Sequence, residues 1–122
     1  MKKILIIDDD PVMRALLSEA LGHAYSVSTA GDGAEGVETL QRDRHDLVVL
    51  DLLMPRMHGY EVCQRIREDP GLAGVKIIIS SSKAYGHDIK TAKTAGADCY
   101  LVKPYSMADI RAKIAELLGE PR

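Results

Sequence analysis

Short runs of aliphatic and β-branched residues alternate five times with longer segments in which apolar residues recur at helical spacing. A continuous apolar run bounded by turn residues is typical of a buried strand, and its alternation with amphipathic helices is typical of a mostly parallel sheet. The expected fold class is therefore α/β. The pattern predicts strands near residues 3–8, 25–30, 46–51, 75–80 and 98–102.

Capping residues and apolar stripes predict a helix after each strand. Asp10 is the expected N-cap of the first helix, with Pro11 at its first position. Asp32 and Ser106 are the expected N-caps of the second and fifth helices, and the fourth, within residues 84–95, has the weakest apolar stripe. The residues expected to face the core are Met13, Leu16, Leu17, Ala20 and Leu21 in the first helix, Val37 and Leu40 in the second, Val62, Cys63 and Ile66 in the third, Ile89, Ala92 and Ala95 in the fourth, and Met107, Ile110, Ile114, Leu117 and Leu118 in the fifth.

Length and charge narrow the classes of function. A chain of 122 residues fits one domain with a hydrophobic core of ordinary size. The formal net charge is −2 and the 16 basic residues are scattered, so direct binding of nucleic acid by this chain is not expected. The apolar stretches are short and no hydrophobic signal region follows Met1, so we expect no membrane insertion and a cytoplasmic location.

The cysteines and histidines show no metal-ligand spacing. Cys63 and Cys99 are expected to be reduced and partly buried thiols. The histidines lie in or near predicted loops, so we expect solvated side chains, no metal site and no phosphohistidine. They are His23, His45, His58 and His87.

Three carboxylates close two of the predicted strands. Asp8 and Asp9 end the first aliphatic run, and Asp51 ends the third. Because the carboxyl ends of parallel strands meet at one edge of a sheet, we expect the three side chains to gather there. Without a cation, repulsion and desolvation would raise at least one carboxyl pKa and lower stability. With a hard divalent ion such as Mg²⁺, the cluster becomes a site for handling phosphate.

Further motifs follow the other strands in a fixed order. Asp51-Leu52-Leu53-Met54-Pro55 follows the third strand, Ser81 the fourth and Lys103-Pro104 the fifth. With these motifs and the acidic pair, the chain resembles CheY-like receiver domains, the phosphoacceptor modules of two-component response regulators, over essentially its whole length. The resemblance implies a doubly wound, five-stranded parallel sheet of order 2-1-3-4-5, a flavodoxin-like (CheY-like) three-layer sandwich. It also implies a receiver domain over residues 1–119, with residues 120–122 as a tail or linker stump.

The resemblance implies a chemical role for each site residue. Asp51 would be the nucleophile that accepts a phosphoryl group. Asp8 and Asp9 would hold Mg²⁺ with Asp51, and the backbone carbonyl of Leu53 would complete the ligands that the protein supplies. Lys103 would place a compact positive charge against the transferred phosphoryl oxygens.

The resemblance also implies a switch. Serines occupy residues 80–82, and counting in the family pattern selects Ser81 as the hydroxyl that binds the phosphoryl group, which leaves its two neighbours as expected turn hydroxyls. When Ser81 moves inward, Tyr100 would rotate into the vacated space. The Lys103-Pro104 peptide bond is expected to be cis.

Some positions depart from the family pattern. His58 stands where an acidic residue is common and Tyr105 replaces a phenylalanine, and neither touches the chemistry that the resemblance implies. Leu53 and Lys83 flank the path of a hydrolytic water to the aspartyl phosphate. We expect them to obstruct that water or fail to orient it, so that the phosphorylated state persists.

The leading functional hypothesis is a phosphorelay signalling module with no enzymatic activity beyond its own phosphorylation and slow dephosphorylation. Its phosphoryl donor would be a sensor histidine kinase or a phosphotransfer protein, and a downstream protein would bind the face formed by the fourth helix, fifth strand and fifth helix.

Three alternatives use the same fold or chemistry. A phosphohydrolase of the haloacid dehalogenase type would need a carboxylate where Leu53 stands. A flavodoxin-like flavin module would need a phosphate-binding loop where residues 8–11 are acidic. A receiver-like module that binds partners without phosphorylation is the third alternative.

Overall fold

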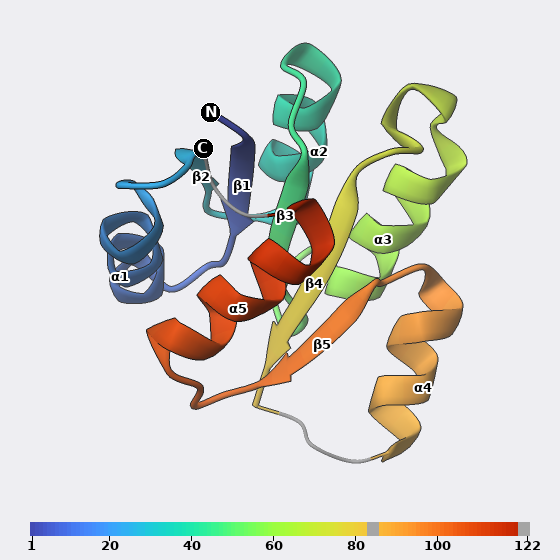
Figure 1. Cartoon of the computed structure of the whole chain (residues 1–122). Helices are drawn as coiled ribbons and strands as arrows, with labels where there is room; N and C mark the ends of the chain where they lie inside the picture. The colour runs from blue at the N-terminus through green and yellow to red at the C-terminus, as the bar shows by residue number, and fades with distance from the viewer. Residues whose placement is uncertain (83–85, 120–122) are drawn as a thin grey trace.

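The computed structural model describes residues 1–82 and 86–119, and for residues 86–88 the backbone alone. The expected tail at residues 120–122 lies outside these residues. The strands are β1 (Lys3–Ile7), β2 (Ser26–Ala30), β3 (Leu47–Asp51), β4 (Lys76–Ser81) and β5 (Cys99–Val102). They form one parallel sheet in the order β2-β1-β3-β4-β5, so the predicted strands and topology are confirmed (Figure 1).

Helices cover both faces of the sheet and make three layers (Figure 1). The helices are α1 (Pro11–Leu21), α2 (Gly33–Arg42), α3 (Gly59–Glu68), α4 (Gly86–Ala95) and α5 (Met107–Leu118), with a short 3₁₀ helix, η1 (Pro70–Leu72), before β4. Leu17 of α1 and Ile110 of α5 share one core cluster, whereas Val37 of α2, Ile66 of α3 and Ala92 of α4 share the other. The chain therefore crosses from one face to the other as it passes from α1 to α2 and from α4 to α5. None of the helices in the described part of the chain is both long and apolar enough to span a membrane.

The strands are buried on both faces, which explains their continuous apolar runs. In β1, Ile4 and Ile6 belong to the α1/α5 core cluster, and Leu5 and Ile7 belong to the α2/α3/α4 cluster. Successive side chains of a strand point to opposite faces, so a strand covered on both faces shows no polar alternation.

The predicted helix N-caps are present. The Asp10 carboxylate accepts from the Val12 amide at 2.9 Å and the Asp32 carboxylate accepts from the Glu35 amide at 2.8 Å. Ser106 forms a reciprocal capping box with Asp109, with distances of 2.9 and 3.2 Å. These side chains satisfy amide groups that have no partner within the helix.

Three expectations about burial need correction. Leu16 was expected to face the core but is 54% exposed, because α1 contacts the sheet through Leu17 and Leu21 and the adjacent position lies about a quarter turn away. His45 was expected to be solvated but is only 3% exposed, with its Nδ1 3.1 Å from the Asp43 carbonyl oxygen. Cys63 faces the core, as its place on the apolar stripe predicted, but it is fully rather than partly buried, and this burial raises the pKa of its thiol to about 12.

Arg67 joins three segments at the amino-terminal edge of β4. Its guanidinium donates to the carbonyl oxygens of Gly96 at 3.0 Å and Val75 at 2.7 Å, and to the Asp98 carboxylate at 2.9 Å. The same Asp98 oxygen accepts from the Ile77 amide at 2.8 Å. The end of α3, the start of β4 and the loop before β5 are therefore held by one cation and its hydrogen-bond partners.

Arg67→Ala should lower the free energy of unfolding by about 2 kcal/mol or more, because the backbone carbonyls and the Asp98 carboxylate lose a charged donor in a partly buried setting. Arg65→Ala is the matched control. Arg65 pairs with Glu61 on the same helix, and its side chain is 54% exposed against 26% for Arg67, so its removal should cost less than about 0.5 kcal/mol. Urea denaturation measures both, and equal losses would contradict the role given to Arg67.

Candidate functional site

The ends of β1 and β3 bring three carboxylates together. Asp8 follows β1 and Asp51 ends β3, and these strands pair side by side, with Ile7 opposite Leu50. One oxygen from each of Asp8, Asp9 and Asp51 lies within 4.8 Å of the other two. Asp8 is 2% exposed and Asp51 8%, whereas Asp9 is exposed. Two of the three acidic groups are thus removed from water at the carboxyl edge of the sheet.

A lysine from a more distant strand reaches the same point. Lys103 follows β5, and its Nζ lies 3.3 Å from Asp8 Oδ2 and 3.7 Å from Asp51 Oδ1. The Lys103 amide donates to the Ser81 carbonyl oxygen at 2.7 Å. The Lys103-Pro104 peptide bond is cis, as expected from the resemblance.

The electrostatics follow from burial and from an excess of negative charge. Burial, followed by repulsion from the Asp8 carboxylate, raises the pKa of Asp51 to about 6, and the attraction of Lys103 offsets only part of this. Burial disfavours the charged form of Lys103, but the neighbouring carboxylates Asp51 and Asp8 outweigh it and leave the pKa of Lys103 above its ordinary value. One lysine therefore does not balance three acids.

Asp8 is held by its own chain and by an arginine that the sequence analysis missed. Its Oδ1 accepts from the Asp10 amide at 2.9 Å, and its backbone carbonyl accepts from Arg14 Nη1 at 2.7 Å. Arg14 lies in the first turns of α1, so its side chain can reach back over the end of β1. A basic residue shortly after the acidic pair was the available signal.

The loop after Asp51 approaches its own strand closely. The Gly59 amide donates to the Leu52 carbonyl at 2.9 Å. A Cβ at Gly59 would lie 2.8 Å from both the backbone carbonyl oxygen of Asp51 and the Leu52 Cα. Only glycine fits this contact without displacing the backbone. Leu53 is exposed in this loop. His58 is the N-cap of α3, with Nδ1 accepting from the Tyr60 amide at 3.2 Å, rather than a freely solvated histidine.

The serines at the end of β4 have different environments. Ser81 is buried, and its backbone pairs with Val102 of β5. Ser80 was expected to be a turn hydroxyl, but it is a buried residue of β4 whose Oγ lies 2.9 Å from Tyr105 Oη. Ser82 is exposed just beyond the strand, as a turn hydroxyl would be.

The structure describes one of the two remaining expected residues. Tyr100 is half-buried in β5 and packs against the α2/α3/α4 core cluster. Lys83, expected to affect dephosphorylation, lies outside the described residues.

The acidic cluster fits a hard divalent cation. Its donors are all carboxylate oxygens, the ligand type that Mg²⁺ prefers, and they lie close enough to share one ion. The pKa of Asp51, raised by burial and then by repulsion from Asp8, points the same way, because added positive charge would favour the ionised carboxylate.

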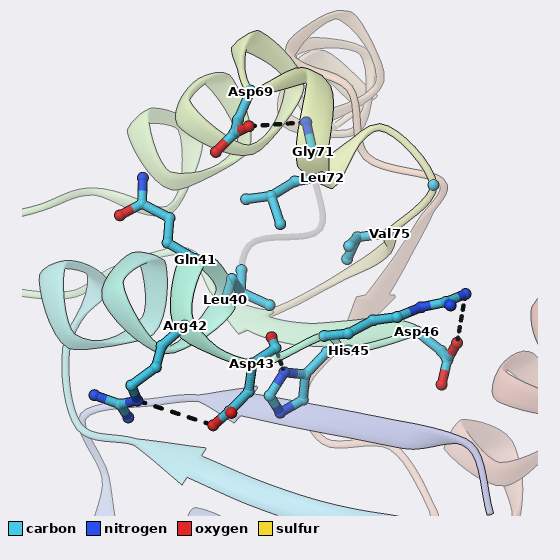
Figure 2. A pocket seen from close by; sticks show the side chains of 12 residues that line it. Leu40, Gln41, Arg42, Asp43, His45, Asp46, Asp69, Gly71, Leu72 and Val75 are labelled. Atoms are coloured by element: carbon cyan, nitrogen blue, oxygen red, sulfur yellow. Dashed lines mark hydrogen bonds and ion pairs between the residues drawn. The ribbon is translucent and has the colours of Figure 1, made fainter.

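A cleft of about 550 Å³ lies at the opposite edge of the sheet, between the end of α2, the loop before β3 and η1 (Figure 2). Among its charged side chains, Arg42 pairs with Asp43 at 3.9 Å and Arg44 with Asp46 at 4.0 Å, and the Asp69 carboxylate accepts from the Gly71 amide at 2.9 Å. The buried His45 ring points away from Leu72 and Val75, which line the other side (Figure 2). The three clustered carboxylates and Lys103 lie at the carboxyl edge, away from this cleft.

Comparisons with known proteins agree with this geometry. The family model described as "Response regulator receiver domain" matches residues 4–115. The chain is 39% identical over 118 residues to the "Probable transcriptional regulator ycf27" of Porphyridium aerugineum, a match that covers 96% of this chain and 48% of that protein. The chain spans about half the length of the curated relatives it matches.

Solved structures show the same fold. The chemotaxis protein CheY4 of Vibrio cholerae is similar with a TM-score of 0.92 and 29% identity, covering 97% of this chain and 99% of that chain. The response regulator TrrA of Thermotoga maritima, in complex with Mg²⁺-BeF, is similar with a TM-score of 0.85 and 35% identity, covering 97% and 100%.

Asp51→Asn should stabilise the protein at pH 7 when no divalent cation is present. With a pKa of about 6 in the folded chain and about 4 unfolded, Asp51 binds a proton in the folded state that the unfolded state has already lost, so its contribution to stability falls as pH rises from 4 to 6. We expect a gain of roughly 1–3 kcal/mol at pH 7 in urea denaturation, which disappears below pH 4. A loss of stability at pH 7 would contradict the electrostatics described above.

Proposed function

This chain belongs to the response regulator receiver domain family of two-component systems, and on that premise we propose that Asp51 accepts a phosphoryl group from a sensor histidine kinase or a phosphotransfer protein. The observation that carries the proposal is the placement of Lys103, whose ammonium lies within 4 Å of both Asp8 and Asp51. A buried carboxylate beside a fixed cation can act as a nucleophile toward a phosphoryl group whose oxygens need positive charge.

The transfer is a displacement at phosphorus. A carboxylate oxygen of Asp51 forms the new bond while the phosphorus–nitrogen bond of the donor phosphohistidine breaks. The electron pair stays on the imidazole, which takes a proton from solvent. Lys103 stabilises the charge on the phosphoryl oxygens during the transfer, and burial of Asp51 excludes water that would compete for its carboxylate.

Asp8, Asp9 and Asp51 would hold Mg²⁺ together with the backbone carbonyl of Leu53. The carboxylate spacing supports the assignment of the three aspartates, and Leu53 follows Asp51 by two residues in the chain. When bound, the ion would neutralise negative charge on the phosphoryl oxygens and on the acidic cluster.

The phosphorylated state would be transmitted through Ser81 and Tyr100. Ser81 ends β4 beside the acidic cluster, and its hydroxyl would donate to the phosphoryl group and draw the following loop inward. Tyr100 packs on the α4 side of the sheet, where it would then change position. A downstream protein would bind the face of α4, β5 and α5, and thus sense that change.

The donor would approach over an apolar border of the site. Val12 and Leu16 are exposed on one side of α1, which begins directly after the acidic residues, and Leu53 is exposed in the loop after Asp51. Exposed large apolar side chains beside a reactive group are typical of a protein-binding surface.

The proposal covers a receiver domain over residues 1–119 that works in the cytoplasm and catalyses only its own phosphorylation and slow dephosphorylation. Several relatives are named as transcriptional or DNA-binding regulators, and this chain matches about half of their length. For this chain itself, the balanced charge supports a protein partner rather than nucleic acid.

Incubation with acetyl phosphate and Mg²⁺ should add one phosphoryl group to the parent chain, seen as an intact-mass increase, and Asp51→Asn should show none. Asp43→Asn, at the opposite edge of the sheet, is the control and should behave as the parent does. Labelling of Asp51→Asn to the parental extent would place the acceptor elsewhere. An unlabelled parent that nonetheless binds Mg²⁺ would instead support a module that binds partners without phosphorylation.

Leu53→Asn should speed the loss of the phosphoryl group by roughly threefold to tenfold, because an amide can orient the hydrolytic water that an exposed leucine cannot bind. The decay of the phosphorylated mass after donor removal measures the rate. Leu53→Ala separates two causes, since it removes apolar bulk without adding a hydrogen-bonding group. An unchanged or slower rate in Leu53→Asn would contradict the role of Leu53.

A further inference from the structure

A hydrogen bond on the α1/α5 side of the sheet joins β4, the strand next to β3, to the loop that carries Lys103. Ser80 Oγ and Tyr105 Oη lie 2.9 Å apart. Ser80 pairs with Asp51 in the register of β3 and β4, and Tyr105 follows Lys103 by two residues. The bond therefore runs from the strand position beside the phosphoryl acceptor to the loop that carries the cation.

The lysine loop, residues 103–105, is hydrogen-bonded to β4 at both of its ends. The Lys103 amide donates to the Ser81 carbonyl at 2.7 Å, and the Tyr105 hydroxyl pairs with that of Ser80. The first holds the backbone at the end of β5, and the second holds the loop two residues further on. A loop held at two points restricts the direction of the Lys103 side chain more than a loop held at one.

The Ser80–Tyr105 hydrogen bond lies in a buried, apolar setting. Ser80 is fully buried, and the Tyr105 ring packs against the α1/α5 core cluster. Burial raises the pKa of Tyr105, which keeps the phenol protonated and able to donate at neutral pH. Removing either hydroxyl would leave the other without its partner in an apolar setting, so the folded chain strongly favours the bonded arrangement.

We infer that the Ser80–Tyr105 hydrogen bond positions Lys103 for phosphoryl transfer. Neither hydroxyl needs to touch the phosphoryl group. Tyr105 is a positioning residue that acts through Lys103, and Ser80 is the fixed point on β4 to which it is bonded. The inference rests on the proposed function, since that function requires the Lys103 ammonium to be held in place.

The test compares Tyr105→Phe, Ser80→Ala and the double variant with the parent chain. The measured quantities are the maximal rate of phosphorylation by acetyl phosphate at saturating Mg²⁺ and the affinity for Mg²⁺, the latter from the rise of Tm with Mg²⁺ concentration. We expect each single variant to be slower by about threefold to tenfold, the double variant to be no slower than either, and the Mg²⁺ affinity to stay within about twofold of the parent.

Two further variants separate positioning from stability. Thr39→Val removes a buried hydroxyl that donates to the Glu35 carbonyl at 2.8 Å on α2, so it should lower Tm by a few degrees without changing the rate. In a Lys103→Ala background, Tyr105→Phe should cause no additional slowing, because the cation that it positions is absent.

The possible outcomes are distinct. Parental rates in the single variants, additive losses in the double variant, or further slowing in the Lys103→Ala background would overturn the inference and leave the proposed function intact. No phosphorylation of the parent chain would overturn the proposed function and the inference with it. Slowing of Thr39→Val to the same extent would also overturn the inference, because loss of stability alone would then explain the rates.

Discussion

The crowding of negative charge at the carboxyl edge of β1 and β3 is the constraint on which the rest of the site depends. Parallel strands all end at one edge, so Asp8 and Asp51 lie side by side once the sheet forms, and both are buried. Burial and mutual repulsion raise the pKa of Asp51 to about 6 and make its ionised form costly. On the function proposed here, the same features would make Asp51 reactive toward an electrophile and receptive to a cation. Stability and reactivity are therefore opposed at this edge, as is common for functional sites.

Lys103 offsets part of this negative charge, although the strand that precedes it is not a neighbour of β3. It follows β5, which is separated from β3 by β4, so its side chain must cross the end of one strand to reach Asp51. The position of the ammonium therefore depends on the loop after β5 and on the alignment of β4 with β5. At the other edge, Arg67 holds the start of β4 to the loop before β5. The contacts of Arg67 at the amino-terminal edge thus help to fix the alignment of β4 with β5 on which the position of Lys103 depends.

The parts of the fold that could be predicted from sequence are those dictated by local pattern. Buried parallel strands need continuous apolar runs, and helix starts need side-chain acceptors, so the strands and the caps at Asp10 and Asp32 were found. The gathering of the acidic residues followed from strand direction alone. Burial that depends on tertiary contacts could not be predicted from the local sequence pattern. Leu16 fits an apolar stripe but lies outside the contact of α1 with the sheet, and His45 is polar yet buried. Arg14 could be noticed only as a basic residue near the acidic pair, because its contact is with a backbone carbonyl, which no side-chain pattern identifies.

The polar residues Ser80 and Tyr105 show why the remainder of the site could not be predicted. Either residue alone favours a simple interpretation, a hydroxyl in a turn or an aromatic residue in place of phenylalanine. Only the three-dimensional structure shows that the two hydroxyls meet, 25 residues apart in the chain. A serine inside a buried strand is unfavourable unless its hydroxyl has a partner, so each residue accounts for the presence of the other. Because the pair lies between Asp51 and the loop of Lys103, its hydrogen bond connects the acidic strand ends to the cation that partly neutralises them. The balance of charge between the acidic residues and Lys103 thus depends in part on a neutral hydrogen bond in the neighbouring core.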